Sequence, residues 1–373
     1  MGLVAYGAPQ LDVPVRLNVN ENPFPVPDSV VQAITNAVAA CAGDLNRYPD
    51  RDARRLRTLL AEYLAEESAV NVEPHHIWRA NGSNEVMLQL YQAYAGPGRI
   101  VMSFEPTYSM YAEYARTSNS TYLTTGRGAE FELDLDAAQT ELERTKPTLV
   151  IIASPNNPTG TAARAEDIAQ IATQLGSWSG LLIVDEAYAE FRRPGTPSSL
   201  ELLSEHANLV VTRTLSKAFG LAGARIGYAI AADPQVIEDI QLVRLPYHLS
   251  AVSQVVACAA LEHRADLRAQ VAVLRTERGR LHAWLLAGGW EVLPSDANFL
   301  AFGKFPDRQA IWQALLDQGV LIRVTGPDGF LRVSIGTPQE NDRFRAALQS
   351  VHAQAHSGGS HAARGHGDTT SPS

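Results

Sequence analysis

Cysteine is scarce in this sequence, and only Cys41 and Cys258 occur among its 373 residues. Two widely separated cysteines are too few for a disulfide framework, and they lack the close pairing that a zinc site needs. We expect both to be small core residues and the chain to have no metal site. A reducing cytosol suits such a composition.

Long apolar runs and blocks of basic charge are also missing. No unbroken apolar run approaches the roughly 20 residues that span a bilayer, and the first residues lack a basic region followed by an apolar stretch. The formal net charge is −9, and lysine and arginine are scattered. Nucleic acid and anionic membrane surfaces attract clustered basic residues. We therefore expect a cytoplasmic protein without nucleic-acid or membrane partners.

Apolar residues make up 45% of the chain and charged residues 19%, which is enough for a large core. From residue 52 to about 250, helical stretches alternate with uninterrupted apolar runs at 149–153, 181–185 and 209–213. Such runs are typical of strands buried on both faces. They predict an α/β domain whose largely parallel sheet lies between helices.

The pattern changes along the chain and predicts four segments. Residues 1–45 read as an extended arm and a first helix, capped by Asp28 or Ser29 and running through Ala40, which contribute to a small domain. The large domain spans 46–250, and a C-terminal α+β domain of 251–355 opens with a long helical region. Residues 356–373 combine Gly, Ser and His without periodicity and predict a disordered tail.

Asp185 ends the apolar run at 181–185, where open α/β sheets bind ligands. A carboxylate that emerges from a buried strand needs a cationic or hydrogen-bonding partner. A protonated pyridine nitrogen would be such a partner, and the pairing would keep a cofactor ring able to accept electrons. Taken alone, Asp185 is more simply explained as a helix cap or a member of a structural ion pair.

Lys217 follows the run at 209–213 by a short polar loop and is the one lysine between Lys146 and Lys304. Its neighbours are mostly small and apolar. Loss of solvation would lower the pKa of its amine and leave it free to form a Schiff base. The ordinary alternative is a surface lysine.

A phosphate site is indicated around the same region. Ser216 offers a hydroxyl, Arg225 a guanidinium, and residues 81–84 the backbone N–H groups of a helix start that includes Ser83 and Asn84. Taken singly, these are an N-cap motif and a possible salt-bridge former. Together, around Lys217, they favour phosphate binding.

The segments SPNNPTG, VDEAY, SKAFG and ARIGY, in this order, resemble the fold type I aminotransferases over nearly the whole chain. The resemblance implies a large domain with a mostly parallel, seven-stranded sheet and a smaller α+β domain. It also implies pyridoxal 5'-phosphate as cofactor. Lys217 would hold the cofactor and move the proton, and Asp185 would bind the ring nitrogen. The remaining implied cofactor contacts are Asn157 and Tyr188 to the ring hydroxyl, and Ser216, Arg225, Ser83 and Asn84 to the phosphate.

Two tyrosines extend this resemblance. Tyr108 falls where the family places an aromatic ring against the cofactor, and Tyr48 resembles the tyrosine that reaches the neighbouring subunit's phosphate. A homodimer with shared active sites is implied. The plainer alternatives are a core residue for Tyr108 and an ordinary turn for Tyr48.

Two arginines bear on the substrate. Arg332 lies where the family binds a carboxylate, and Arg323 would add a second cation suited to a dianion, unless it is a surface residue. The start of the chain and the segments PTYSMY, LVRLPYHLS and PSDANFLAFG resemble histidinol-phosphate aminotransferases of class II, particularly actinobacterial ones. That resemblance implies reversible amino transfer from histidinol phosphate to 2-oxoglutarate, giving imidazole-acetol phosphate and glutamate, in histidine biosynthesis.

Two positions depart from the pattern of these enzymes. Asn84 stands where many members have an acid, and Asn22 stands where some have a tyrosine, so we expect Asn22 to be structural. Three other functions remain open at this point. They are an aromatic amino acid aminotransferase, a threonine-phosphate decarboxylase and a non-catalytic module that binds pyridoxal phosphate.

Overall fold

The computed structural model describes residues 7–359, so residues 1–6 of the expected arm and 360–373 of the expected tail lie outside it. The helices are α1 (Asp28–Ala42), α2 (Arg54–Ser68), α3 (Ser83–Tyr94), α4 (Met110–Thr117), α5 (Leu135–Thr145), α6 (Ala165–Gly176), α7 (Gln235–Val243), α8 (Ala251–Glu262), α9 (Arg264–Ala287), α10 (Arg308–Asp317) and α11 (Pro338–Gly359). Short 3-10 helices are η1 (Pro74–His76), η2 (Ala189–Phe191), η3 (Ser199–Leu202) and η4 (Ala222–Ala224).

The strands are β1 (Val15–Arg16), β2 (Ile77–Asn81), β3 (Ile100–Glu105), β4 (Thr121–Gly126), β5 (Leu149–Ala153), β6 (Leu181–Asp185), β7 (Leu209–Thr214), β8 (Ile226–Ala231), β9 (Glu291–Val292), β10 (Phe299–Gly303), β11 (Val320–Leu321) and β12 (Leu331–Ser334). In the described residues, seven of them form one sheet in the order β2-β8-β7-β6-β5-β3-β4. Strands β3 to β7 pair in parallel, whereas β8 is antiparallel to both of its neighbours. The predicted α/β fold with a mostly parallel sheet is confirmed.

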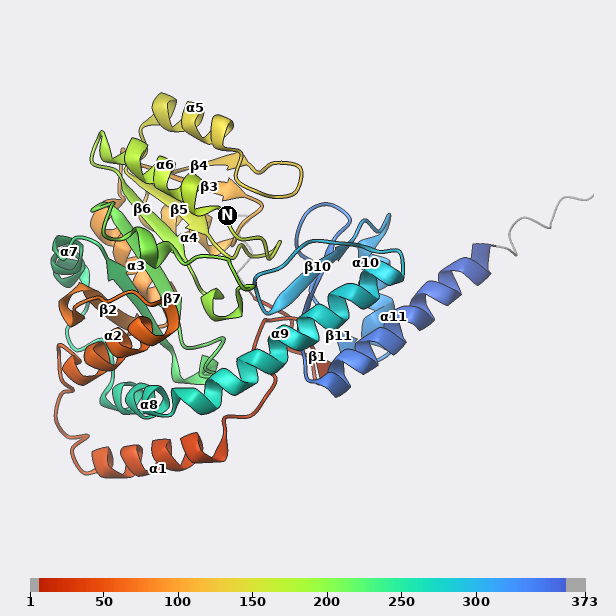
Figure 1. Cartoon of the computed structure of the whole chain (residues 1–373), viewed down its shortest axis with the longest axis horizontal. Coiled ribbons are helices and arrows are strands. Elements are labelled where there is room, and N and C mark those ends of the chain that lie inside the picture. Colours follow the sequence, from red (N-terminus) through yellow and green to blue (C-terminus); the bar gives the residue numbers. More distant parts are fainter. Residues whose placement is uncertain (1–6, 360–373) are drawn as a thin grey trace, which may run out of the picture.

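Helices cover both faces of this sheet (Figure 1). Along β5 and β6, successive side chains point to opposite faces. Ile151 and Ile183 pack in one apolar cluster with α3, α4 and α7, while Ile152 and Val184 pack in the other with α2, α5 and α6. Burial on both faces explains why these strands are uninterrupted apolar runs.

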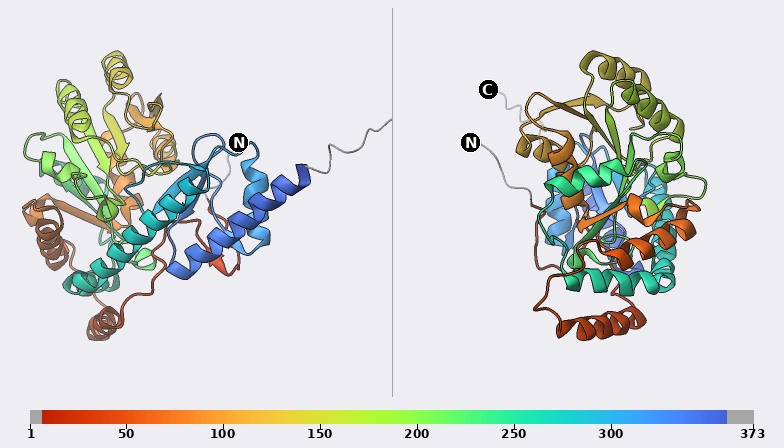
Figure 2. Two further views of the ribbon diagram at one scale, coloured as in Figure 1. Left: turned by 45° about the vertical axis from the view of Figure 1, so that its right-hand side comes forward. Right: turned by 90° about the vertical axis from the view of Figure 1, so that its left-hand side faces the viewer.

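The smaller domain contains the antiparallel sheet β12-β10-β9 and the helices α10 and α11. Helix α9 runs from α8, beside the large domain, to this region (Figure 1). The arm joins it through β1, which pairs in parallel with β11, whereas α1 packs on α8 and stands out from the body of the large domain (Figure 2).

Three local expectations are wrong. Helix α1 starts after Pro27, and neither Asp28 nor Ser29 caps it, because the Ser29 hydroxyl donates instead to Asp266 (2.6 Å). Helix α11 includes residues up to Gly359, four positions into the segment predicted to be a disordered tail. Cys258 is buried as expected, but Cys41 lies on the partly exposed α1.

Within residues 7–359, none of the helices has the length and apolarity to cross a membrane. The same part of the chain contains no cluster of His, Cys, Asp or Glu side chains arranged to hold a metal ion.

Candidate active site

A cavity of about 260 Å³ lies at the carboxyl edge of the central sheet, between the large domain and the small one. Side chains from the arm, from the ends of β5, β6 and β7, from the start of α3 and from the small domain line it. Every predicted site residue except Tyr48 takes part: Ser83, Asn84, Tyr108, Asn157, Asp185, Tyr188, Ser216, Lys217, Arg225, Arg323 and Arg332.

Asp185 ends β6 and is 8% exposed. Its carboxylate accepts hydrogen bonds from the Tyr111 hydroxyl (2.8 Å) and the Thr212 hydroxyl (3.1 Å), both of which are neutral. No described cationic side chain forms an ion pair with it, and burial raises the pKa of Asp185 above its ordinary value. A protonated ring nitrogen in the cavity would be the missing cation, so this residue fits a pyridine-type cofactor.

Lys217 lies in the turn that follows β7, where its Nζ donates to the Val19 carbonyl of the arm (3.2 Å). Burial lowers the pKa of Lys217 to about 8, and the positive charges of Arg332 and Arg225 act in the same direction. An amine with this pKa has an appreciable neutral fraction near pH 7. It is therefore suited to attack a carbonyl and to exchange protons.

At the phosphate end of the cavity, two main-chain segments approach each other closely. Gly82 precedes α3 with a φ of 80°, and a Cβ on it would lie 2.7 Å from Nη2 of Arg225. A Cβ on Gly227 would lie 2.1 Å from the Ser83 nitrogen. These two glycines let the guanidinium and the N-terminus of α3 meet, which is the arrangement of an anion site.

Ser216 completes this end of the cavity. The Thr214 hydroxyl donates to Ser216 Oγ (2.9 Å) and accepts from the Ser216 N–H (3.1 Å). This pair of bonds orients the serine hydroxyl. Thr214 itself lines the cavity and was not singled out in the sequence.

Two arginines from the small domain form one wall. Arg323 and Arg332 are directly paired across an antiparallel bridge, with reciprocal backbone hydrogen bonds of 3.0 Å, so their side chains project to the same side. Arg332 donates to Asn157 and, through Nη2, to the Asn18 carbonyl (2.9 Å). Arg323 Nη1 is buried and has no hydrogen-bond partner among the described residues.

Tyr188, Tyr108 and Asn22 make different kinds of contact. The Tyr188 hydroxyl accepts from the amide of Asn20 (3.1 Å). The Tyr108 ring packs edge-on against Tyr111, with 5.6 Å between centroids. Asn22 donates to the Ala218 carbonyl (3.3 Å), so its observed contacts are with the protein itself.

Tyr48 lies outside the cavity of its own chain. Its side chain is 79% exposed and stacks on Tyr247, with 4.3 Å between ring centroids and 11° between planes. A role at the active site of the same chain is therefore not available to it.

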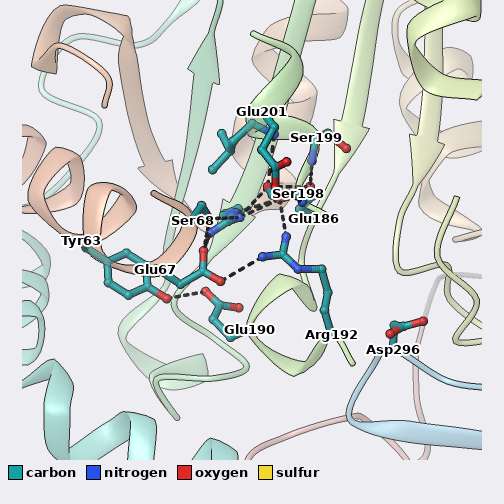
Figure 3. Close-up of polar contacts among 12 residues, drawn as sticks. Tyr63, Glu67, Ser68, Glu186, Glu190, Arg192, Ser198, Ser199, Glu201 and Asp296 are labelled. Atoms are coloured by element: carbon teal, nitrogen blue, oxygen red, sulfur yellow. Dashed lines mark hydrogen bonds and ion pairs between the residues drawn. The ribbon is translucent and has the colours of Figure 1, made fainter. Parts of the chain in front are cut away.

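Sequence reasoning missed a buried charge network behind the site (Figure 3). Glu186, the residue after Asp185, accepts two bonds from Arg213 (3.0 and 2.8 Å), and Arg213 also pairs with Glu67 on α2 (2.6 Å). Burial alone would raise the pKa of Glu67, but Arg213 and Arg192 together lower it to about 2. This network ties β6, β7 and α2 together directly behind the cavity.

Tyr111 was missed as well, although it lies in the same short motif as Tyr108. The two tyrosines are three positions apart, with Tyr108 just before α4 and Tyr111 in its first turn. That spacing was the available signal. The partner, Asp185, is 74 residues away in the sequence, so the contact itself could not be read from it.

Comparison with known proteins agrees with this geometry. Residues 13–348 match the family "Aminotransferase class I and II". The chain is 50% identical over 354 residues to the histidinol-phosphate aminotransferase of Thermobifida fusca, covering 95% of this chain and 94% of the relative. It is 52% identical over 349 residues to histidinol-phosphate aminotransferase 3 of Burkholderia lata, covering 94% and 93%.

A solved structure of similar fold is the histidinol-phosphate aminotransferase from Sinorhizobium meliloti in complex with pyridoxal-5'-phosphate. It superposes with a TM-score of 0.81 at 27% identity and covers 92% of each chain. The family resemblance noted in the sequence is thereby confirmed. The chain belongs to the class I and II aminotransferases, and its relatives place it with the histidinol-phosphate aminotransferases of that family.

Proposed function

We propose that this protein is a histidinol-phosphate aminotransferase that uses pyridoxal 5'-phosphate. It moves an amino group reversibly between L-histidinol phosphate and 2-oxoglutarate, giving imidazole-acetol phosphate and L-glutamate. The named activity of relatives at about half identity supports this function. The structural observation that carries it is the arginine pair, Arg323 and Arg332, on the cavity wall beside Lys217.

The arginine pair suits a phosphate monoester. Two guanidinium groups on one wall match a dianion better than a single carboxylate would require, because each provides a fork of donors. Within residues 7–359, Arg323 Nη1 is buried and has no hydrogen-bond partner, and an anionic ligand would relieve the resulting desolvation penalty. The same wall can bind a carboxylate of glutamate, which a transaminase must accept in turn.

The residues around the cavity fit the cofactor group by group. Asp185 would bind the ring nitrogen, Asn157 and Tyr188 the ring hydroxyl, and Tyr108 would lie against the ring. Ser216, Arg225 and the amides of Ser83 and Asn84 would bind the phosphate. When bound, the cofactor supplies an electron sink for the carbanion formed at the substrate carbon.

The chain's own contribution to the reaction centres on Lys217. Its Nζ would hold the cofactor until the incoming amine displaces it. The freed amine would then accept the proton from the substrate carbon and return it to the cofactor carbon. A pKa of about 8 makes this amine both a base and an acid near neutral pH. The Val19 carbonyl and the arginine wall orient the two reacting partners, which lowers the entropic barrier.

The direct test compares amino transfer to 2-oxoglutarate from histidinol phosphate and from phenylalanine, with purified, cofactor-loaded protein. We expect a strong preference for histidinol phosphate. Comparable turnover of phenylalanine would move the enzyme to aromatic amino acid metabolism. Release of carbon dioxide from threonine phosphate, without need for a keto acid, would indicate a decarboxylase, and binding of the cofactor without turnover of any of these would indicate a non-catalytic module.

We further propose a homodimer in which Tyr48 reaches the phosphate site of the other subunit. The exposed residues Leu45, Tyr48, Leu245 and Tyr247 support such an interface, because the two segments that carry them meet at the stacked tyrosines. Mixing Tyr48→Ala and Lys217→Ala subunits tests it. Subunit exchange should produce heterodimers with one intact site and more activity than either variant alone, and absence of any gain at proven exchange would contradict shared sites.

A further inference from the structure

A second cavity, also about 260 Å³, lies behind the turn that carries Lys217. Lys217 lines the first cavity, whereas the next two residues, Ala218 and Phe219, line the second. Its other walls come from α2, η2 and the first half of α9. A molecule in this cavity would touch the same turn from its far side.

The inner end of the second cavity is formed by Glu190, which is 8% exposed. Its Oε1 accepts from the Tyr63 hydroxyl (3.0 Å), while no side chain among the described residues donates to Oε2 (Figure 3). Burial raises the pKa of Glu190 to about 7, with Arg213 acting to lower it and Glu67 to raise it. The carboxyl group is therefore poised to ionise, and a cationic donor beside Oε2 would stabilise the ionised form.

The rim of the cavity has the opposite character. Arg264 and Arg268 share one carboxylate, Glu66, and Arg275 forms no ion pair with any described residue, donating instead to the Arg192 carbonyl. Arginine is thus in excess along this face of α9. An anionic group at the rim would be stabilised by charge-assisted hydrogen bonds.

Between the acidic end and the basic rim the wall is apolar, with Phe219 packed edge-on against Tyr63 (5.1 Å between centroids) and with Leu267 and Val271 beside them. A simple anion would provide no cationic donor for the carboxyl group of Glu190. A simple cation would meet the arginines at the entrance. A molecule with an inner ammonium, an outer carboxylate and an apolar body satisfies all three surfaces.

We propose that the second cavity binds a free α-amino acid with an apolar side chain, its ammonium on Glu190, its carboxylate on Arg268 and Arg275. The side chain lies against Phe219 and Val271. This site is separate from the proposed catalytic one and does not depend on which reaction that site performs. Its ligand would contact the turn that carries Lys217 without entering the catalytic cavity.

The test is titration calorimetry of the cofactor-loaded protein with 2-methylleucine, which has no α-proton and so cannot be transaminated. The matched fragments are 4-methylpentan-2-amine, which lacks its carboxylate, and 2,4-dimethylpentanoate, which lacks its ammonium. We expect the amino acid to bind at least about tenfold more tightly than either fragment. Equal binding of one fragment would make this a plain cation or anion site and would overturn the proposal, as would no binding.

Variants locate the binding. Glu190→Gln and Arg275→Ala should each weaken it by about tenfold or more, and Glu143→Gln, an exposed carboxylate on α5, should leave it unchanged. Binding should survive Arg332→Ala, which impairs only the catalytic cavity. Arg275 is exposed, so its variant remains informative if Glu190→Gln folds poorly. Binding that is lost in Arg332→Ala but kept in both other variants would assign the ligand to the catalytic cavity and refute the proposal.

The pH dependence is a further check. Glu190 faces Tyr63 and Glu67 from α2, Arg213 from β7, Tyr228 from β8, and the arginines 192, 268 and 275. Because its carboxyl group ionises around pH 7, affinity for the ammonium should rise between pH 6 and pH 8 and this rise should vanish in Glu190→Gln. An unchanged slope in that variant would contradict the assignment. Since no turnover is measured, a negative result here says nothing against the transaminase function.

Discussion

Two adjacent carboxylates at the end of β6 face opposite sides of the sheet and have opposite surroundings. Asp185 points into the catalytic cavity, where its donors among the described residues are neutral, two hydroxyls and a backbone N–H. Glu186 points to the back, where Arg213 binds it through two nitrogens and two serines donate to it. The chain thus neutralises the charge of Glu186 itself. The cavity side carries charges whose partners must come from a ligand.

The largest effect on the cavity side is expected for Lys217→Ala. Removing Nζ takes away both the attachment point and the base, so transamination of histidinol phosphate should fall by at least about 1,000-fold. Circular dichroism and the melting temperature of the apo-protein should stay close to the wild type, because the amine has a single weak hydrogen bond to Val19. Turnover within tenfold of wild type would disprove its catalytic role.

On the back of the sheet the largest expected effect is on folding. Arg213→Met removes the closer of two arginines that pair with both buried carboxylates, Glu186 and Glu67, and leaves them with Arg192. Breaking one partner of a buried pair costs about 3–5 kcal/mol. Denaturant unfolding of the apo-protein measures this. The matched control is Arg116→Met, whose exposed pair with Glu113 should contribute less than about 1 kcal/mol. Equal losses in the two variants would erase the distinction between the sides.

Asp185→Asn should show the reverse pattern. The pKa of Asp185 is raised in the folded protein relative to the unfolded chain. Ionisation of this group therefore destabilises the folded apo-protein as the pH rises above the pKa in the unfolded chain, and an amide removes that penalty. The apo-protein should therefore melt no lower than wild type at pH 7. Turnover should nevertheless drop by about 100-fold, because the ring nitrogen loses its anionic partner. A clear fall in stability with unchanged rate would reassign Asp185 to the structural side.

Tyr111→Phe should give the smallest effect. It removes one neutral donor from Asp185, which raises the carboxyl pKa further and weakens its hold on a protonated ring nitrogen. We expect kcat to fall about threefold to tenfold with little change in KM, and a shift in the pH at which the absorption of the bound cofactor changes. Tyr94→Phe removes a similar bond, to Asp239 outside the cavity, and should leave that spectrum unchanged.

Sequence reasoning located the strands on which the site is built because their environment leaves a strong pattern. The runs at 149–153 and 181–185 coincide with β5 and β6, since burial on both faces demands apolar residues throughout. Asp185 stands out at the end of one such run, and Lys217 follows the run at 209–213 by a short polar loop. The family resemblance supplied their expected partners.

Other features could not be predicted because they depend on distant residues or on the path of the chain. Glu67 and Arg213 are 146 positions apart, and nothing local indicates that they pair. The reversal of β8 follows from its short link to β7 through η4, which contains no crossover helix. Whether that link crosses the sheet or returns beside it is decided by tertiary packing.

Gly227 has a consequence for how this site can change over evolutionary time. At this position two main-chain segments touch, because Gly227 contacts the backbone of Ser83. Any side chain at position 227 would displace the amides that form the phosphate end of the cavity. Another wall of the cavity carries the side chains of Arg323 and Arg332. Ordinary substitutions on that wall can therefore change which substrates bind, while the cofactor end tolerates almost none. One fold can in this way acquire different substrate specificities and keep the same cofactor site.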